Sequence, residues 1–328
     1  MTTIGLAGDT MLGRKVAERL AEVEPSELFD AAVVAVCNEA DILALNLECC
    51  ISDRGSPWPD PRKPFFFRAP PHAVEALSLL GVDVVTLGNN HALDFGEEAL
   101  LDTFAHLDRA GIAWVGAGED LGRARAAVVV EHNGLRLGVL GISDHPEDFA
   151  AEPDRPGIAF ADLARGVPQW VGDAIDAVDA DVVLLTPHWG PNMTAQPVPH
   201  VVEAAETLAA SGVDLIAGHS AHVFHGVRVL GGRGGAPIPA LYDLGDFIDD
   251  YAVDATLRND LGLLWLVTLD GSRPVRLEAV PLALDYCFTR LADPDEAQWI
   301  TDRFTTACAA MGTDVQEADG RLVINWTP

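Results

Sequence analysis

The sequence has few basic residues and lacks any long uncharged hydrophobic run. Its 328 residues contain 21 Lys and Arg against 50 Asp and Glu, for a formal net charge of −29 at pH 7. A surface this acidic repels phosphate groups, so we expect neither a nucleic-acid partner nor binding to a membrane. No uncharged run approaches the roughly 18 residues of a membrane span, and the N-terminal residues lack the pattern of a signal peptide. We therefore expect a cytoplasmic protein.

The sequence also has few cysteines and no common nucleotide-binding motif after its first apolar run. The chain has five cysteines, an odd number without a CxxC pair, and this argues against a zinc knuckle or a thioredoxin-type redox site. We expect buried, reduced thiols. No GxGxxG or GxxxxGK motif follows the first apolar run, which excludes the common dinucleotide and phosphate loops.

What the sequence does have is a series of short apolar runs, each followed by polar residues. These runs are rich in Val, Ile and Leu without alternation, and they lie at 4–7, 42–45, 82–87, 137–142, 182–186 and 213–217. Such runs are typical of strands buried on both faces. Helix-like segments at 73–80, 97–110 and 201–210 lie between them. The alternation predicts a layered α/β fold with a substantially parallel sheet.

Two further regions complete the predicted organisation. Residues 52–71 are rich in proline and include Phe65-Phe66-Phe67-Arg68, which predicts a long, packed loop that faces the substrate. Beyond Pro274 we expect a strand through 281, a helix at 294–311 and a strand at 321–326. We therefore predict one domain over 1–284, with a C-terminal extension, 285–328, packed on it.

The polar residues at the strand ends have metal-binding chemistry. In chain order they are Asp9, Glu48, Asn90, His91, His188, His219 and His222. If the strands are mostly parallel, these side chains arrive at one edge of the sheet, where α/β proteins bind ligands. Mixed carboxylate, amide and imidazole ligands suit divalent metal ions. Each residue alone has a structural explanation, since Asp9 could cap a helix and Asn90 could serve a turn. If every one of these residues had only a structural role, several unrelated roles would have to coincide at the same position after each strand. We therefore predict a metal site.

Five motifs in this order resemble a known family. They are Gly8-Asp9-Thr10-Met11-Leu12-Gly13-Arg14, Asn46-Leu47-Glu48, Asn89-Asn90-His91-Ala92-Leu93-Asp94-Phe95-Gly96, His188-Trp189-Gly190 and Gly218-His219-Ser220-Ala221-His222-Val223. Together they resemble the CapA family of poly-γ-glutamate capsule biosynthesis-type proteins, a branch of the calcineurin-like metallophosphoesterase superfamily. The resemblance implies a four-layer α/β/β/α sandwich with a metal centre at the strand ends.

The resemblance also implies roles for individual residues. One divalent ion would be held by Asp9, Glu48 and His222, and a second by Glu48, Asn90, His188 and His219, with Glu48 bridging. The metal would be Mn²⁺, Fe²⁺, Zn²⁺ or Mg²⁺. The candidate catalytic residues are His91, as general acid or transition-state donor, with Asp94 and Arg14. The candidate substrate-binding residues are Arg68, Trp189 and Asn192.

Some positions depart from the family pattern. Met11 stands where wider superfamily members carry a His, which leaves open whether one ion or two are bound. Glu48 replaces Asp at the bridging position, and Asn192 replaces an acidic residue. Asp243 and Asp246 lie in a stretch that reads Ser-Leu-Gly-Asn-Phe in the family. They could supply another ligand, disfavour a phosphate monoester, or lie in a solvated acidic turn.

Three functional hypotheses follow from these observations. The first is a metal-dependent hydrolase that acts on a small phosphoester or a related substrate. The second is a CapA-type enzyme of poly-γ-glutamate or γ-glutamyl/amide-bond biosynthesis: a transferase, ligase or hydrolase. The third is a non-catalytic, metal-containing subunit of a biosynthetic complex. We expect a small-molecule or γ-glutamyl-type substrate in either enzyme.

Overall fold

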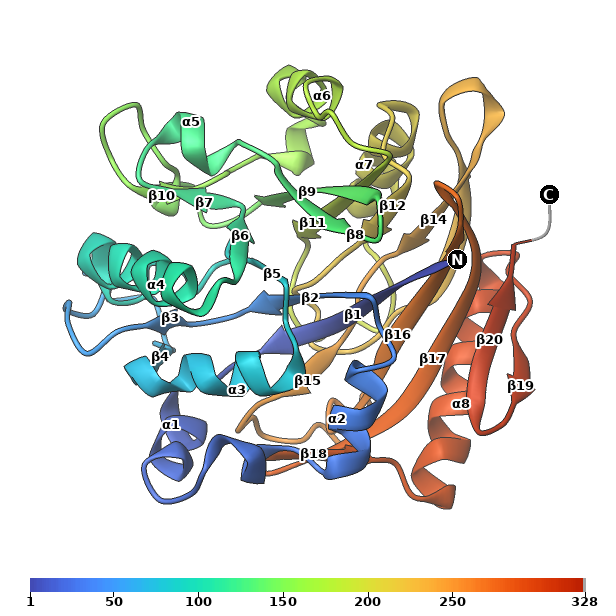
Figure 1. The fold of residues 1–328 in the computed structure, drawn as a ribbon, viewed down its shortest axis with the longest axis horizontal. Coiled ribbons are helices and arrows are strands. Elements are labelled where there is room, and N and C mark those ends of the chain that lie inside the picture. The colour runs from blue at the N-terminus through green and yellow to red at the C-terminus, as the bar shows by residue number, and fades with distance from the viewer. Residues whose placement is uncertain (327–328) are drawn as a thin grey trace.

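Two β-sheets pack face to face in the computed structural model, which describes residues 1–326 (Figure 1). The larger sheet contains β1 (Thr2–Thr10), β2 (Ile42–Leu47), β5 (Val84–Thr86), β6 (Ala113–Val115), β16 (Leu261–Asp270), β17 (Arg273–Asp285), β19 (Gln316–Ala318) and β20 (Arg321–Asn325). In space these strands follow the order β19-β20-β17-β16-β1-β2-β5-β6. Two short strands join this sheet, since β15 (Asp246–Ile248) pairs with β1 and β18 (Phe288–Leu291) pairs with β17.

The smaller sheet has six strands. They are β8 (Val128–His132), β9 (Leu135–Ser143), β11 (Val182–His188), β12 (Leu215–Ala217), β13 (Val227–Gly231) and β14 (Pro237–Leu241). Their spatial order is β13-β14-β12-β11-β9-β8. Two isolated pairs lie outside the main sheets: β3 (Cys50–Ile51) with β4 (Arg68–Ala69), and β7 (Ala117–Gly118) with β10 (Gly157–Ile158).

Helices surround the two sheets. They are α1 (Arg14–Leu20), α2 (Ala31–Cys37), α3 (Val74–Leu80), α4 (Gly96–Ala110), α5 (Leu121–Ala124), α6 (Gln169–Asp176), α7 (Pro199–Ala210) and α8 (Pro294–Ala310). Figure 1 shows α4 at the left, α3 below it, and α6 and α7 at the top, with both sheets between them. Among residues 1–326, no helix is both long and apolar enough to cross a membrane.

The layers follow from the alternation of side chains along the strands. In β2, Ile42 and Ala44 pack in the core between the two sheets, whereas Leu43 and Leu45 pack under the helices. A strand buried in this way needs apolar residues at every position, because successive side chains point to opposite faces. Each fully buried Leu or Ile side chain contributes about 2 kcal/mol to folding. The predicted four-layer α/β/β/α sandwich is confirmed.

The predicted elements lie close to the observed ones. The six apolar runs form β1, β2, β5, β9, β11 and β12, and the three helix-like segments form α3, α4 and α7. Neighbouring strands are parallel from β1 through β2 and β5 to β6, and from β9 through β11 and β12 to β14. The remaining long strands, β16 and β17, are antiparallel. The carboxyl ends of the parallel strands therefore lie together in each sheet.

The C-terminal residues take part in the same sheet. Both β18 and β20 pair with β17, and Ile300, Phe304 and Cys308 of α8 are buried in the core between the sheets. Asp293 caps the N-terminus of α8, and its carboxylate accepts the backbone N–H groups of Asp295 and Glu296. The division into 1–284 and 285–328 stays a prediction.

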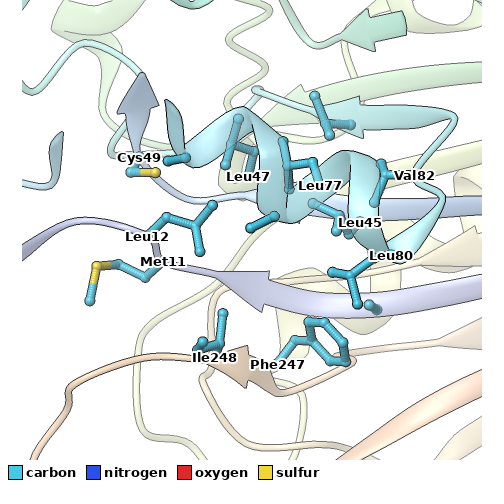
Figure 2. Packing of buried hydrophobic residues seen from close by; sticks show 14 of the residues in the cluster. Met11, Leu12, Leu45, Leu47, Cys49, Leu77, Leu80, Val82, Phe247 and Ile248 are labelled. Atoms are coloured by element: carbon cyan, nitrogen blue, oxygen red, sulfur yellow. The ribbon is translucent and has the colours of Figure 1, made fainter. Parts of the chain in front are cut away.

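Met11 lies in the hydrophobic core under the helices. Its side chain is fully buried in a cluster that includes Leu12, Leu77 and Phe247, and Figure 2 shows it beside Leu12. The Met11 sulfur accepts a hydrogen bond from the Gly13 backbone N–H at 3.1 Å. The thioether is therefore used in packing, and it is a poor ligand for hard divalent ions in any case.

The proline-rich loop packs against the body of the protein, as expected. Its ends are held by the β3–β4 pair, and Phe67 is buried. Gly55 has a φ of +84°, and a Cβ at this position would lie 2.1 Å from the Phe95 carbonyl oxygen. Only glycine permits this approach.

Candidate metal centre and its cavities

Asp9 and Glu48 come from neighbouring parallel strands, and both are fully buried. Their placement depends on Gly8, because the Asp9 backbone N–H donates to the Gly245 carbonyl at 2.9 Å. A Cβ on residue 8 would lie 1.9 Å from that oxygen. The glycine before Asp9 is therefore required for β15 to lie against β1. The Asp9 carboxylate accepts a hydrogen bond from the Asn46 side chain at 2.7 Å.

Two histidines reach Asp9 from the loop after β12. The Nδ1 atom of His219 lies 3.1 Å from one carboxylate oxygen of Asp9, and the Nδ1 atom of His222 lies 3.3 Å from the other. His222 has a φ of +59°, an uncommon backbone conformation for a residue other than glycine. The loop is held in place by Asp243, which accepts the backbone N–H groups of Ala221 and Gly245 at 2.7 and 2.9 Å.

Four of these side chains form a compact group. One ligand atom each from Asp9, Glu48, His222 and Asp246 lies within 4.8 Å of all the others. The Asp246 carboxylate is 2.9 Å from His222 Nδ1, and Asp246 is the register partner of Asp9 in the β1–β15 pair. Both Asp243 and Asp246 are buried. The solvated acidic turn considered from the sequence is therefore wrong.

Several buried polar atoms around this group lack a hydrogen-bond partner among the described residues. They are both carboxylate oxygens of Glu48, both ring nitrogens of His188 and the side-chain oxygen of Asn90. Burying such atoms without a partner is costly, and for a carboxylate the cost is largest. Divalent cations could bind the oxygens of Glu48 and Asn90 and one ring nitrogen of His188, so the donor set fits a metal. Asp9, Glu48 and His222 belong to the compact group and could hold one ion. A second ion held by Glu48, Asn90, His188 and His219 stays a prediction.

Burial and neighbouring charges shift the pKa values of the buried acids and histidines in the centre. Burial raises the pKa of Glu48 well above its ordinary value, and the charge of Asp9 adds to the effect. Burial also acts to raise the pKa of Asp9, but hydrogen bonds and charge from His219 and His222 outweigh it and hold this pKa well below normal. Burial keeps the pKa of His188 well below normal. His188 is therefore neutral at pH 7, the form in which an imidazole binds a metal.

His91 and Asp94 form a hydrogen-bonded dyad beside the centre. The Nδ1 atom of His91 lies 2.6 Å from an Asp94 carboxylate oxygen, while its Nε2 atom lies 3.8 Å from Glu48. Asp94 also accepts the backbone N–H of Phe67 at 2.6 Å and pairs with Lys63 at 2.8 Å. Asp94 thus fixes the imidazole so that Nε2 faces the centre.

A cavity adjoins each side of the centre. The first has a volume of about 330 Å³ and is lined by Arg14, Phe65, Phe67, His91, His222 and Tyr251, among others. The second is about 280 Å³ and is lined by Trp58, Arg62, Lys63, Asn90, His145 and Phe149, among others. Of the candidate metal ligands, His222 lines the first cavity and Asn90 lines the second.

The structure brings some of the predicted substrate-binding and catalytic residues to these cavities and leaves others out. Arg14 and Asn192 line the first cavity. The Arg68 guanidinium instead lies over the Phe95 ring, 4.2 Å from its centroid, and donates to the Arg54 carbonyl at 3.0 Å. Trp189 is buried, and its indole N–H donates to the Tyr242 carbonyl at 2.8 Å. Arg68 and Trp189 thus line neither of these two cavities, and their role in substrate binding stays a prediction.

Other residues near the site are not among those predicted from the sequence. Lys63 comes from the proline-rich loop and Tyr251 from the segment after β15, and neither belongs to a strand-end motif. Asp144 and His145 form a second carboxylate–imidazole pair at the end of β9. Asp144 and His145 directly follow the predicted strand at 137–142. They therefore meet the same criterion as the predicted ligands, a polar residue at the end of a buried strand.

Comparisons with known proteins agree with the motifs. The family model described as bacterial capsule synthesis protein PGA_cap matches residues 3–251. A probable polyglutamine synthesis accessory protein of Mycobacterium tuberculosis is 33% identical over 287 residues, covering 83% of this chain and 73% of that protein. The PGA biosynthesis protein CapA of Bacillus subtilis is 27% identical and covers 74% of this chain and 62% of that protein.

Among solved structures, an NAD nucleotidase of Haemophilus influenzae is 11% identical with a TM-score of 0.49, covering 92% of this chain and 55% of that one. The family assignment comes from the family model, which matches about three quarters of the chain, and from the M. tuberculosis relative. The chain therefore belongs to the bacterial capsule synthesis protein family PGA_cap, the family of CapA.

Proposed function

We propose that this chain is a divalent-metal-dependent enzyme that acts on a γ-glutamyl or related amide bond during polyglutamate synthesis. The observation that carries the proposal is the buried Asp9–Glu48–His222 group, with the unpartnered atoms of His188 and Asn90, beside the His91–Asp94 dyad. The printed names of the relatives, which refer to polyglutamine and PGA synthesis, point to the substrate class.

The residues of the chain have distinct parts in this proposal. When bound, divalent ions at the centre would polarise a carbonyl and activate water. Asp94 holds the His91 ring, so His91 Nε2 can give a proton to a leaving amine. Arg14 lines the first cavity and can attract a carboxylate, while Phe67 and Tyr251 exclude water from that cavity.

A phosphoester hydrolase is the second candidate, and the set of metallophosphoesterase-type motifs around Glu48 favours it. The relatives favour amide chemistry, because their printed names refer to polyglutamine and PGA synthesis.

The test begins with metal content, measured by elemental analysis of the wild type, His188→Ala and His219→Ala. About two equivalents in the wild type, with a loss in both variants, supports the centre. Arg68→Ala is a matched control because Arg68 lies over Phe95, outside both cavities. A wild type that binds no divalent metal under any loading condition contradicts the proposal.

The metal-loaded protein is then incubated with γ-linked oligoglutamate and, separately, with a chromogenic phosphodiester. Cleavage or transfer of the oligoglutamate, detected by mass spectrometry, supports the amide proposal. Turnover of the phosphodiester alone supports the second candidate. Metal binding without turnover of either probe favours a non-catalytic subunit.

A further inference from the structure

The β1–β15 pair brings a carboxylate to the centre that the motif-based ligand set does not contain. Asp246 stands directly opposite Asp9 in this parallel pair, and both side chains are buried. The pairing places the carboxylates of adjacent strands on the same side of the sheet. Backbone register thus places the Cα atoms of Asp246 and Asp9 opposite each other on adjacent strands.

The contacts of Asp246 leave one of its oxygens free. Its Oδ1 atom lies 2.9 Å from His222 Nδ1, while its Oδ2 atom is buried without a hydrogen-bond partner among the described residues. If Asp246 served only to orient His222, its second oxygen would be expected to face solvent or a hydrogen-bond donor. The unpaired oxygen instead resembles those of Glu48, which lie in the same group.

The charge balance of the group also favours a bound cation. Three carboxylates, those of Asp9, Glu48 and Asp246, share the group with a single imidazole, that of His222. Like charges at such separations destabilise the protein unless a positive charge lies between them. Met11 cannot contribute a donor of comparable hardness, because its sulfur packs in the hydrophobic core.

We propose that Asp246 is the fourth protein ligand of the first metal ion, together with Asp9, Glu48 and His222. Three carboxylates and one imidazole form a hard, oxygen-rich donor set. Such a set favours Mn²⁺ or Mg²⁺, whereas Zn²⁺ is favoured by nitrogen- and sulfur-rich sites. The inference rests on the proposed function in one respect only, that the centre binds metal.

The test uses calorimetric titration of the metal-stripped wild type, Asp246→Asn and Asp249→Asn with Mn²⁺ and, separately, with Zn²⁺. Asp249 is a buried acid just beyond β15 that lies outside the four-residue group, so its substitution removes a nearby carboxylate that is not a proposed ligand. We expect Asp246→Asn to weaken Mn²⁺ binding about 10-fold or more and Zn²⁺ binding less. We expect Asp249→Asn to change Mn²⁺ binding by less than about 3-fold, since it removes charge but no ligand.

Thermal melting provides a second measurement that separates lost ligation from misfolding. Without metal, Asp246→Asn should melt at the wild-type temperature or above, because one of three crowded carboxylates is gone. The rise in melting temperature on adding Mn²⁺ should be smaller in Asp246→Asn than in the wild type.

Two results would overturn the assignment of Asp246 alone. One is a wild type that binds Mn²⁺ while Asp246→Asn binds it equally well. The other is an equal loss in Asp249→Asn, which would make net charge, and not ligation, responsible. A wild type that binds no divalent metal overturns both this inference and the proposed function.

Discussion

The imidazole of His91 stacks on the ring of Phe67, with the ring centroids 3.8 Å apart and the ring planes inclined by 22°. Phe67 comes from the proline-rich loop, and its backbone N–H also donates to Asp94. The loop therefore supports both members of the His91–Asp94 dyad, through ring packing and through a hydrogen bond. This contact explains why a long excursion from the sheet is packed and not solvated.

Phe67→Ala is expected to destabilise the protein by about 3 to 5 kcal/mol, because it removes a buried aromatic ring and leaves a cavity against His91. The free energy of unfolding from urea denaturation measures the effect. Phe65→Ala is the control in the same loop, since Phe65 is 54% exposed and its loss should change stability by less than about 1 kcal/mol. Equal destabilisation by both substitutions would show that Phe67 does not anchor the loop.

His91→Gln is expected to lower kcat about 100-fold or more while the metal content stays at the wild-type level. The reason is that His91 lies beside the centre without belonging to the compact group of candidate ligands. Asp94→Asn should lower kcat less severely, since it removes the partner that orients the ring. His106→Gln on α4 is the matched control. Wild-type kcat in His91→Gln would exclude His91 as the proton donor.

Arg14→Ala is expected to raise KM for an anionic substrate about tenfold, a loss of about 1.4 kcal/mol of binding energy. Arg14 lines the first cavity and is oriented there by Asp250 at 3.0 Å, with Phe65 and Phe67 within 5.5 Å of its guanidinium carbon. Arg68→Ala should change KM by less than about twofold, because Arg68 lies over Phe95. Steady-state kinetics of both variants decides between the two arginines, and a larger effect of Arg68→Ala would reverse the assignment.

The strand-end residues could be predicted from the sequence because two simple regularities combine at them. Apolar runs mark the buried strands, and parallel strands deliver whatever follows them to a common edge. Asp9, Glu48 and His222 were found in this way, and the structure places them within one compact group. The assignment of each to a particular metal ion stays a prediction.

Residues that reach the site from loops could not be predicted in the same way. Lys63 and Tyr251 lie in segments without periodicity, and only the folded loop reveals that they line the cavities. The direction in which a side chain points could not be predicted either. Nothing in the sequence distinguishes Arg14, which lines a cavity, from Arg68, which stacks on Phe95.

The stability of the protein should depend on pH through His225, which is buried and whose Nε2 atom lies 2.8 Å from the Thr194 carbonyl oxygen. Burial lowers its pKa to about 4, and the charge of Arg303 contributes. In the unfolded chain this histidine takes up a proton near its ordinary pKa of about 6.5, whereas the folded protein takes it up only near 4. The unfolded state therefore binds more protons between these values, and stability is lost as the pH falls through that window.

Between about pH 7.5 and about pH 5, we expect His225 to reduce the free energy of unfolding by about 2 kcal/mol. His225→Gln keeps a side-chain N–H for the Thr194 carbonyl but cannot titrate, so the variant should lack this part of the pH dependence. The measurement is urea denaturation of wild type and variant across the range, since the difference between them cancels the other titrating groups. Parallel pH profiles for the two proteins would mean that His225 is not held neutral in the folded state.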